Sequence, residues 1–267
     1  IHLLPKAYGL QPNTEYLNFI LYNYLPIGIS FILILYHNFF SQIARKNTHF
    51  IRFSMNIQTF ELQLYEKLNK FFFEHDYFLM SEKKQYRKIT STGFSNVIFT
   101  YNAYDTEILL DVNIGCRFEK VEKIAQQYLG NYRDYWEDAN TLVVSIGKFN
   151  DSKNFKYKIQ TESDLEDACE DIRNFLLSRG FDFLAKYSTL ESLNTLFNEK
   201  PNQPCKYVYN QSHRRFKGMI VAKLLNHKQF NDLSEKHQKG LVLSWASEHE
   251  LQTFDRLMTF LMYASDN

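Results

Sequence analysis

Apolar residues recur at helical spacing over the first well-patterned stretch of the chain. They lie along one side of residues 57–74, at Ile57, Phe60, Leu64, Leu68, Phe71 and Phe72. This spacing predicts an α-helix. Asn56 comes directly before it, and asparagine favours the N-cap because its side-chain oxygen accepts a hydrogen bond from the first turn.

Alternation of apolar and polar residues then predicts strands. Residues 77–89, 94–104 and 106–118 form three candidates, and the Ser-Thr-Gly turn at 91–93 separates the first two. In the third candidate every second side chain up to Cys116 is apolar, which is typical of a half-buried strand in an antiparallel sheet. Cys116 is therefore interpreted as a small core residue and not as a nucleophile.

Shorter elements complete this β-rich half. A helix is predicted over residues 118–129, and strands over 141–147 and 155–160. From about residue 161 to the end, apolar positions follow helical spacing. The fold class is therefore predicted as α+β, an antiparallel β-meander with flanking helices followed by a helical C-terminal half.

Capping residues indicate where the C-terminal helices begin and end. Thr161 and Asp164 resemble a capping box, and Gly180 is the expected end of that helix. Ser188 and Glu191 repeat the same spacing for a helix that ends before Pro201. Three further helices are predicted near residues 214–226, 228–239 and 245–263.

The first 54 residues differ in composition from the rest. They contain four basic residues and one acidic residue, and Leu17 to Tyr36 is a stretch of 20 residues with no charge. A bilayer core of roughly 30 Å requires about 20 such residues in a helix. One interpretation is a membrane anchor that Arg45 and Lys46 orient with residues 55–267 facing the cytoplasm, at the inner membrane. The other is upstream sequence, with the protein starting at Met55.

Composition limits the chemistry of residues 55–267, which we expect to be a soluble domain. The net charge of the whole chain is +1, which does not indicate a nucleic-acid partner. The three cysteines are far apart in sequence, which favours reduced thiols in the cytoplasm. Phosphate-binding glycine motifs, zinc-ligand spacings and the serine-hydrolase elbow are absent from the sequence. We therefore predict no cofactor and no structural metal.

One carboxylate cluster could nevertheless support metal-dependent chemistry. Asp105, Glu107 and Asp111 occupy alternate positions on the polar side of the third strand, and clustered oxygens are the ligands that Mg²⁺ prefers. Lys84 or Lys88 on a neighbouring strand could complete a phosphodiesterase or nuclease site. The alternative is an ordinary solvated sheet face with cross-strand ion pairs.

Charged clusters in the C-terminal half could instead bind a partner. Like charges repeat four residues apart at Glu166 and Glu170 and at Asp167 and Asp171, and such repulsion marks either a surface for a basic partner or a solvated helix face. Arg214 and Arg215 stand at a predicted helix start, where the helix dipole disfavours cations. They are interpreted either as an anion contact or as a basic cluster paired with the acidic helix.

The order of elements resembles a bacterial family catalogued as domain of unknown function number 4304. The similarity covers roughly residues 57–200 and rests on a helix, a strand with a central Arg87, two alternating strands and a second helix. The family's first strand begins with Gly-Phe, where this chain has Asp76-Tyr77. The resemblance implies a bacterial α+β domain and no particular activity.

Two functional hypotheses follow. The first is a non-enzymatic interaction protein, an immunity-type or accessory factor that binds a protein partner and touches a membrane only if residues 17–36 are an anchor. The alternative is a metal-dependent phosphodiesterase or nuclease that uses Asp105, Glu107, Asp111 and Lys88.

Overall fold

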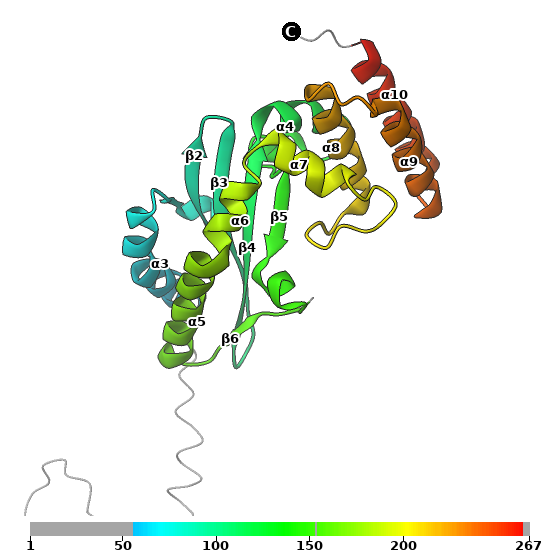
Figure 1. Ribbon diagram of the computed structural model, residues 1–267. Coiled ribbons are helices and arrows are strands. Elements are labelled where there is room, and N and C mark those ends of the chain that lie inside the picture. Colours follow the sequence, from blue (N-terminus) through cyan, green and yellow to red (C-terminus); the bar gives the residue numbers. More distant parts are fainter. Residues whose placement is uncertain (1–55, 153, 264–267) are drawn as a thin grey trace, which may run out of the picture. The chain divides into compact units, whose positions relative to one another are not determined.

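The computed structural model describes residues 56–152 and 154–263, which belong to the compact unit Ser54–Asn267. A six-stranded antiparallel sheet is combined with helices, and the C-terminal half is helical (Figure 1), so the predicted α+β class is confirmed. The interpretations of residues 1–54, with the candidate span at 17–36, lie outside the described residues. None of the described helices is long and apolar enough to cross a bilayer.

Helix α3, Ile57–Glu74, begins where the sequence predicts it. The backbone N–H of Thr59 donates to Asn56 Oδ1 at 2.8 Å, which confirms the N-cap. The helix packs on the sheet through a fully buried stripe, Phe60, Leu64, Leu68 and Phe72.

The sheet has the order β1-β2-β3-β4-β5, and β6 pairs with β4 on the same edge as β5. The strands are β1 Phe78–Met80, β2 Gln85–Thr90, β3 Gly93–Ala103, β4 Ile108–Phe118, β5 Leu142–Ser145 and β6 Tyr157–Ile159. The single strand predicted over 77–89 is wrong. Lys84 adopts a left-handed conformation (φ 52°) after a short 3₁₀ turn, so the chain folds back and forms two strands.

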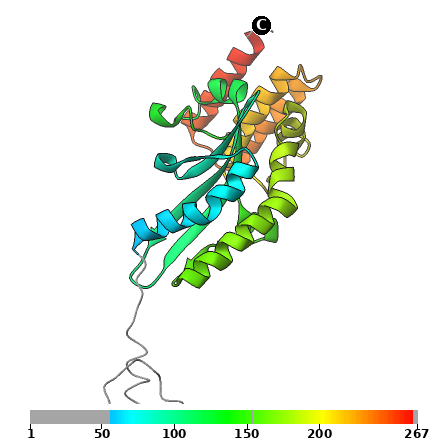
Figure 2. The same ribbon diagram turned by 90° about the vertical axis from the view of Figure 1, so that its left-hand side faces the viewer.

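The two faces of the sheet are covered differently. Helices α3 and α5 (Glu162–Phe175) lie side by side over one face (Figure 2), above the main hydrophobic core. The loop before β5 lies against the other face, where Arg117 donates to the carbonyl oxygens of Trp136 (2.7 Å) and Ala139 (2.8 Å). Asp138 of the same loop accepts from Arg87 at 2.8 Å. Polar contacts therefore hold this second layer.

Gly180 does not end a helix, contrary to the prediction. The chain continues from α5 through a π-helical turn, Leu176–Gly180, into α6, Phe181–Lys186, and Gly180 has helical angles (φ −67°, ψ −48°). A Cβ at this position would lie 2.9 Å from the Leu176 side chain and 3.0 Å from Phe175. The glycine therefore permits close packing and does not act as a stop signal. The next helix, α7 (Leu190–Asn198), is capped by Thr189 and not by Ser188.

The remaining helices form one end of the molecule. They are α4 Glu119–Ala125, α8 Gln211–Leu224, α9 Phe230–Leu243 and α10 Glu248–Tyr263. Helix α8 contacts α4, α7, α9 and α10. Figure 1 shows α9 and α10 on the opposite side of the molecule from α3.

Candidate functional site

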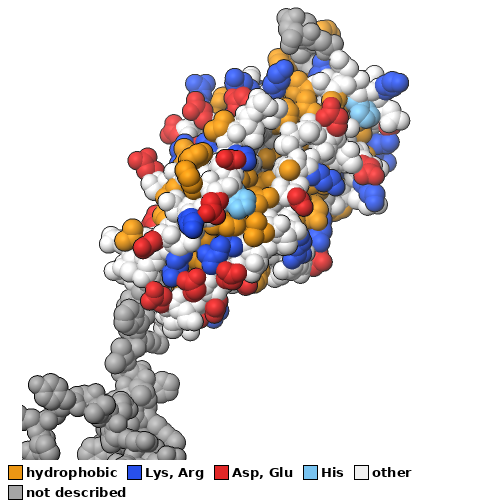
Figure 3. All heavy atoms as spheres, turned by 60° about the vertical axis from the view of Figure 1, so that its left-hand side comes forward, with side chains coloured by type: hydrophobic (Ala, Val, Ile, Leu, Met, Phe, Trp, Pro, Cys, Tyr) orange, Lys and Arg blue, Asp and Glu red, His pale blue; other side chains and the backbone are white. Residues whose placement is uncertain are grey.

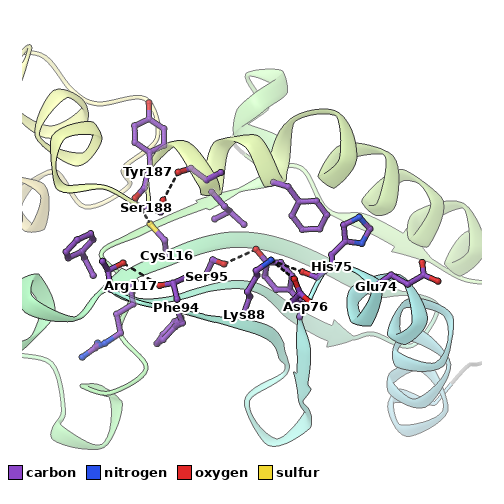
Figure 4. Close-up of a pocket in the computed structure, with 17 residues that line it drawn as sticks. Glu74, His75, Asp76, Lys88, Phe94, Ser95, Cys116, Arg117, Tyr187 and Ser188 are labelled. Carbon is purple, nitrogen blue, oxygen red and sulfur yellow. Dashed lines mark hydrogen bonds and ion pairs between the residues drawn. The ribbon is translucent and has the colours of Figure 1, made fainter.

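A cavity of about 440 Å³ lies between the C-terminal end of α3, helix α6 and the end of the sheet near the β2–β3 turn. We call it the α3–α6 groove. Figure 4 shows Cys116 pointing from the sheet toward Tyr187, and Lys88 beside Asp76. The groove is lined by Glu74, His75, Asp76, Tyr77, Lys88, Thr90, Thr92, Phe94, Ser95, Cys116, Arg117, Phe118, Phe181, Leu184, Ala185, Tyr187 and Ser188.

Local sequence explains why the core is hollow here. Ser95 and Cys116 are paired neighbours on β3 and β4, so two small side chains lie side by side. Helix α3 has already ended, and Asp76 turns the chain away with a left-handed backbone (φ 64°). Aspartate tolerates this conformation, which glycine adopts freely. Neither helix α3 nor the chain after Asp76 therefore fills the space above Ser95 and Cys116.

Aromatic rings form one wall of the groove. The ring of Phe181 stacks on His75 (centroids 4.9 Å apart, interplanar angle 24°) and on Tyr77 (5.4 Å, 27°). The ring of Phe71 also stacks on that of Phe181, with centroids 6.0 Å apart. The His75 ring is oriented by Nδ1, which donates to the carbonyl oxygen of Phe71 at 2.8 Å. These four rings join α3, the chain after it and α6 into one apolar surface.

Polar groups are fixed at the edge of the groove. Lys88 Nζ donates to Asp76 Oδ2 at 2.9 Å and to the carbonyl oxygen of His75 at 3.2 Å. The Tyr77 hydroxyl and Ser95 Oγ are 2.9 Å apart and share a hydrogen bond. The groove therefore combines an apolar wall with a small number of polar groups that already have partners, as ligand sites commonly do.

Two groups in the groove that could act in catalysis stay protonated. Burial raises the pKa of the Cys116 thiol to about 12, and Cys116 Sγ donates to the carbonyl oxygen of Tyr187 at 3.4 Å. Burial also raises the pKa of Tyr77 to about 12. A reactive cysteine requires a thiolate. At neutral pH the Cys116 thiol and the Tyr77 hydroxyl therefore carry their protons, and the structure gives Cys116 no thiolate character.

The surface around the groove is partly apolar. On the face shown in Figure 3, apolar side chains form a band across the middle, and charged side chains of both signs surround it. Three large apolar residues next to groove residues in sequence are well exposed: Phe73 (65%), Phe78 (57%) and Ile89 (73%). The rings of Phe73 and Phe78 contact each other, with centroids 5.9 Å apart. Ile89 lies on the opposite sheet face from Lys88, so Phe73 and Phe78 form the contiguous exposed pair, and such pairs are typical of interaction surfaces.

The predicted carboxylate site is not assembled. Glu107 forms an ion pair with Lys158 at 3.0 Å, and Asp105 is exposed in the β3–β4 turn. Lys88 aligns through Ser95 with Cys116, five positions from Asp111, so Lys88 and Asp111 lie on opposite faces of the sheet. Within residues 56–152 and 154–263, no group of three His, Cys, Asp or Glu side chains is placed to hold a metal ion.

Lys84, the other lysine considered for that site, is also directed elsewhere. Its ammonium group lies 4.0 Å from the centre of the Tyr101 ring. The structure therefore gives this carboxylate set no shared ligand position, and neither Lys84 nor Lys88 is placed to complete it.

Half of the acidic set on α5 is neutralised inside the molecule. Glu166 pairs with Lys67 of α3 at 2.6 Å and with Arg173 at 3.4 Å, and Glu170 pairs with Arg173 at 2.8 Å. These cations lower the pKa of both carboxyl groups. The contacts attach α5 to α3 and relieve the repulsion expected from the sequence.

The other half of the acidic set remains at the surface. Asp167 and Asp171 are exposed, and neither has a basic nitrogen within 4.0 Å among the described residues. They are the part of the predicted acidic surface that is open to a partner.

Arg214 and Arg215 are not surface residues, so the prediction of a basic cluster paired with the acidic helix is wrong. Their exposed fractions are 2% and 6%. Arg214 donates to the carbonyl oxygens of Phe197 and Pro201, and Arg215 donates to Pro201 as well. Backbone carbonyl oxygens accept the hydrogen bonds of these arginines, where the sequence led us to expect carboxylates.

Sequence reasoning missed most residues of the α3–α6 groove. His75, Tyr77, Ser95 and Phe181 come from separate segments and have no common spacing. Comparisons of the chain with protein-family models, with curated proteins and with solved structures give no match.

Proposed function

We propose that this chain is a protein-binding factor that takes an apolar side chain of its partner into the α3–α6 groove. The observation that carries the proposal is the aromatic wall formed by His75, Tyr77 and Phe181 next to a cysteine and a tyrosine that both stay protonated. A volume of about 440 Å³ lies in the range of sites that bind a compact group.

The neighbouring surface supports a protein as the occupant. Aromatic residues are enriched at protein interfaces, and the exposed rings of Phe73 and Phe78, which contact each other, add apolar area next to the groove residues Glu74 and Tyr77. The side chains of Glu74 and Asp76 at the edge are 57% and 77% exposed. Glu74 pairs with Lys70 at 3.8 Å and Asp76 pairs with Lys88 at 2.9 Å, so both carboxylates already have a cation and the apolar surface is the main attraction for a partner.

This proposal keeps the class predicted from the sequence, an immunity-type or accessory interaction factor, and relocates the binding surface. Glu166, Glu170, Arg214 and Arg215 have internal partners. Binding by α5 is then limited to Asp167 and Asp171, which can add charge attraction to a contact centred on the groove.

Site-specific cross-linking tests the proposal. A photoreactive amino acid is placed at Ala185, an exposed residue of α6 that lines the groove, or at Asp182, an exposed residue of the same helix outside it. In the native cells, the residue at 185 is expected to yield one cross-linked protein species, joined through an apolar segment. The residue at 182 is the matched control and is expected to yield much less.

The cross-linked segment then serves as a synthetic peptide in a binding titration. Ala185→Trp fills the groove without removing a core contact and should weaken peptide binding at least about tenfold, as expected for loss of one buried anchor. Asp182→Trp should bind like the wild type. Equal cross-linking at 182 and 185, or unchanged binding in Ala185→Trp, contradicts the proposal.

A further inference from the structure

Two arginines of α8 place their charges together inside the protein. Arg214 Nη2 and Arg215 Nη1 donate to the same carbonyl oxygen, that of Pro201, at 3.1 and 3.0 Å. Arg214 Nη1 also donates to the carbonyl oxygen of Phe197 at 3.2 Å. Both residues are more than nine-tenths buried. Like charges are therefore held close to each other and away from water.

The described residues provide no negative charge for this pair. No carboxylate among residues 56–152 and 154–263 lies within 4.0 Å of either guanidinium group, and Nε of both arginines has no hydrogen-bond partner. Burying a charge without a counter-ion is strongly unfavourable. A built site for an anion resolves this imbalance.

The neighbouring residues leave space for the arginines and add no positive charge beside them. Gly240 of α9 faces the Arg215 guanidinium so closely that a Cβ there would lie 2.1 Å from Nη1. His237 lies nearby and is neutral at neutral pH, because burial and then the two arginines lower its pKa to about 3. The positive charge of this region at neutral pH therefore comes from Arg214 and Arg215.

Arg214 connects this buried charge to a cavity of about 460 Å³ between α7, the segment before α8 and the end of α6. We call it the α7–α8 cavity. Its charged lining residues are four cations and one anion: Lys186, Lys200, Lys206, Arg214 and Glu199. Lys206 pairs with Asp151 at 2.7 Å. Lys186 and Lys200 are exposed and have no carboxylate within 4.0 Å among the described residues.

We propose that the α7–α8 cavity binds the phosphate group of a small molecule, with Arg214 at its base and Lys186 and Lys200 at its rim. The two Nη groups of Arg214 already donate to backbone carbonyls, so Arg214 offers an anion its positive charge and its Nε–H, which has no hydrogen-bond partner. A phosphate dianion balances this excess of cations better than a single carboxylate does. A volume of about 460 Å³ suits a small molecule, and the site lies apart from the α3–α6 groove.

Thermal unfolding and calorimetry with defined anions test the assignment. Inorganic phosphate and pyrophosphate are titrated against the whole protein, with sodium chloride at equal ionic strength and with acetate as comparisons. Saturable stabilisation by phosphate and pyrophosphate, beyond that of chloride, is expected. Binding of pyrophosphate should be tighter than that of acetate by at least about tenfold.

Variants locate the binding. Lys186→Ala combined with Lys200→Ala leaves the buried arginines in place, so folding is preserved, and it should weaken pyrophosphate binding about tenfold or more. Lys228→Ala combined with Lys239→Ala removes two exposed charges elsewhere and is the matched control. Stabilisation no greater than that by chloride, acetate binding as tight as phosphate, or equal effects of the two double variants would overturn the proposal.

Discussion

The buried ion pair between α4 and α8 gives a quantitative prediction. Glu122 is fully buried, Lys217 is 7% exposed, and Lys217 Nζ lies 2.9 Å from Glu122 Oε1. The ammonium group also donates to the carbonyl oxygen of Asn140 at 2.6 Å, and Glu122 Oε2 accepts from Gln126 at 2.6 Å. Lys217→Met keeps most of the apolar stem and leaves the Glu122 carboxylate buried without its cation.

The expected loss is large because an uncompensated charge remains. Removing one partner of a buried pair typically lowers the free energy of unfolding by about 3–5 kcal/mol. For a domain of this size, each 1 kcal/mol lowers the melting temperature by about 2–4 °C, so a fall of about 6–20 °C is expected. Adding Glu122→Gln to Lys217→Met should recover most of the loss, since replacing both charged groups is often nearly neutral.

Urea unfolding followed by tryptophan fluorescence and circular dichroism measures these changes. The midpoint should shift while the slope stays constant, which shows that stability and not the unfolded state has changed. Lys236→Met is the matched control, because Lys236 pairs with Asp232 at 2.7 Å on an exposed helix surface. It should cost less than about 1 kcal/mol. A Lys217→Met cost as small as that, or additive losses in the double variant, would refute the reasoning.

Two further predictions concern single residues. The folded-state pKa of His237 is about 3, because burial and then Arg214 and Arg215 oppose its protonation. In the unfolded chain His237 has its ordinary pKa of about 6.5, so between pH 6.5 and 3 the unfolded state binds more protons than the folded state. The free energy of unfolding should fall by up to about 1.4 kcal/mol per pH unit as the pH drops from 6.5 toward 3, and His237→Gln should reduce this slope in urea titrations; an identical slope would contradict the assignment. Gly93→Ala would place a Cβ 2.1 Å from the carbonyl oxygen of Arg117, a backbone atom held in the sheet. The free energy of unfolding should therefore fall by about 1–3 kcal/mol or more. An unchanged melting temperature in thermal unfolding would contradict this expectation and show that the turn relaxes.

The sequence by itself determined the features that depend on neighbouring residues. Helix α3 and its Asn56 cap, the long strand β4 and the fold class were predicted correctly. The capping box also forms, with Asp164 Oδ2 accepting from the Thr161 N–H at 2.8 Å and Thr161 Oγ1 accepting from the Asp164 N–H at 3.2 Å. Each of these contacts spans three or four residues, or follows from a period of 2 or 3.6 along the chain.

Tertiary structure decided where the charged residues lie. Arg214 and Arg215 are typical surface residues by type, yet the carbonyl oxygens of Phe197 and Pro201 accept their hydrogen bonds inside the protein. Glu166 likewise pairs with Lys67, a residue 99 positions away. Side-chain type specifies which partner a charge requires, and only the packed fold specifies which partner is within reach.

The same limit applies to the two cavities. The α3–α6 groove depends on the register that sets Ser95 beside Cys116 and on Phe181 arriving from a helix far along the chain. The α7–α8 cavity likewise combines residues of α6, α7 and α8. A single sequence carries the periodicity and the caps because those interactions are local. The cavities are set by the packing of segments distant in sequence, and no spacing along the chain encodes them.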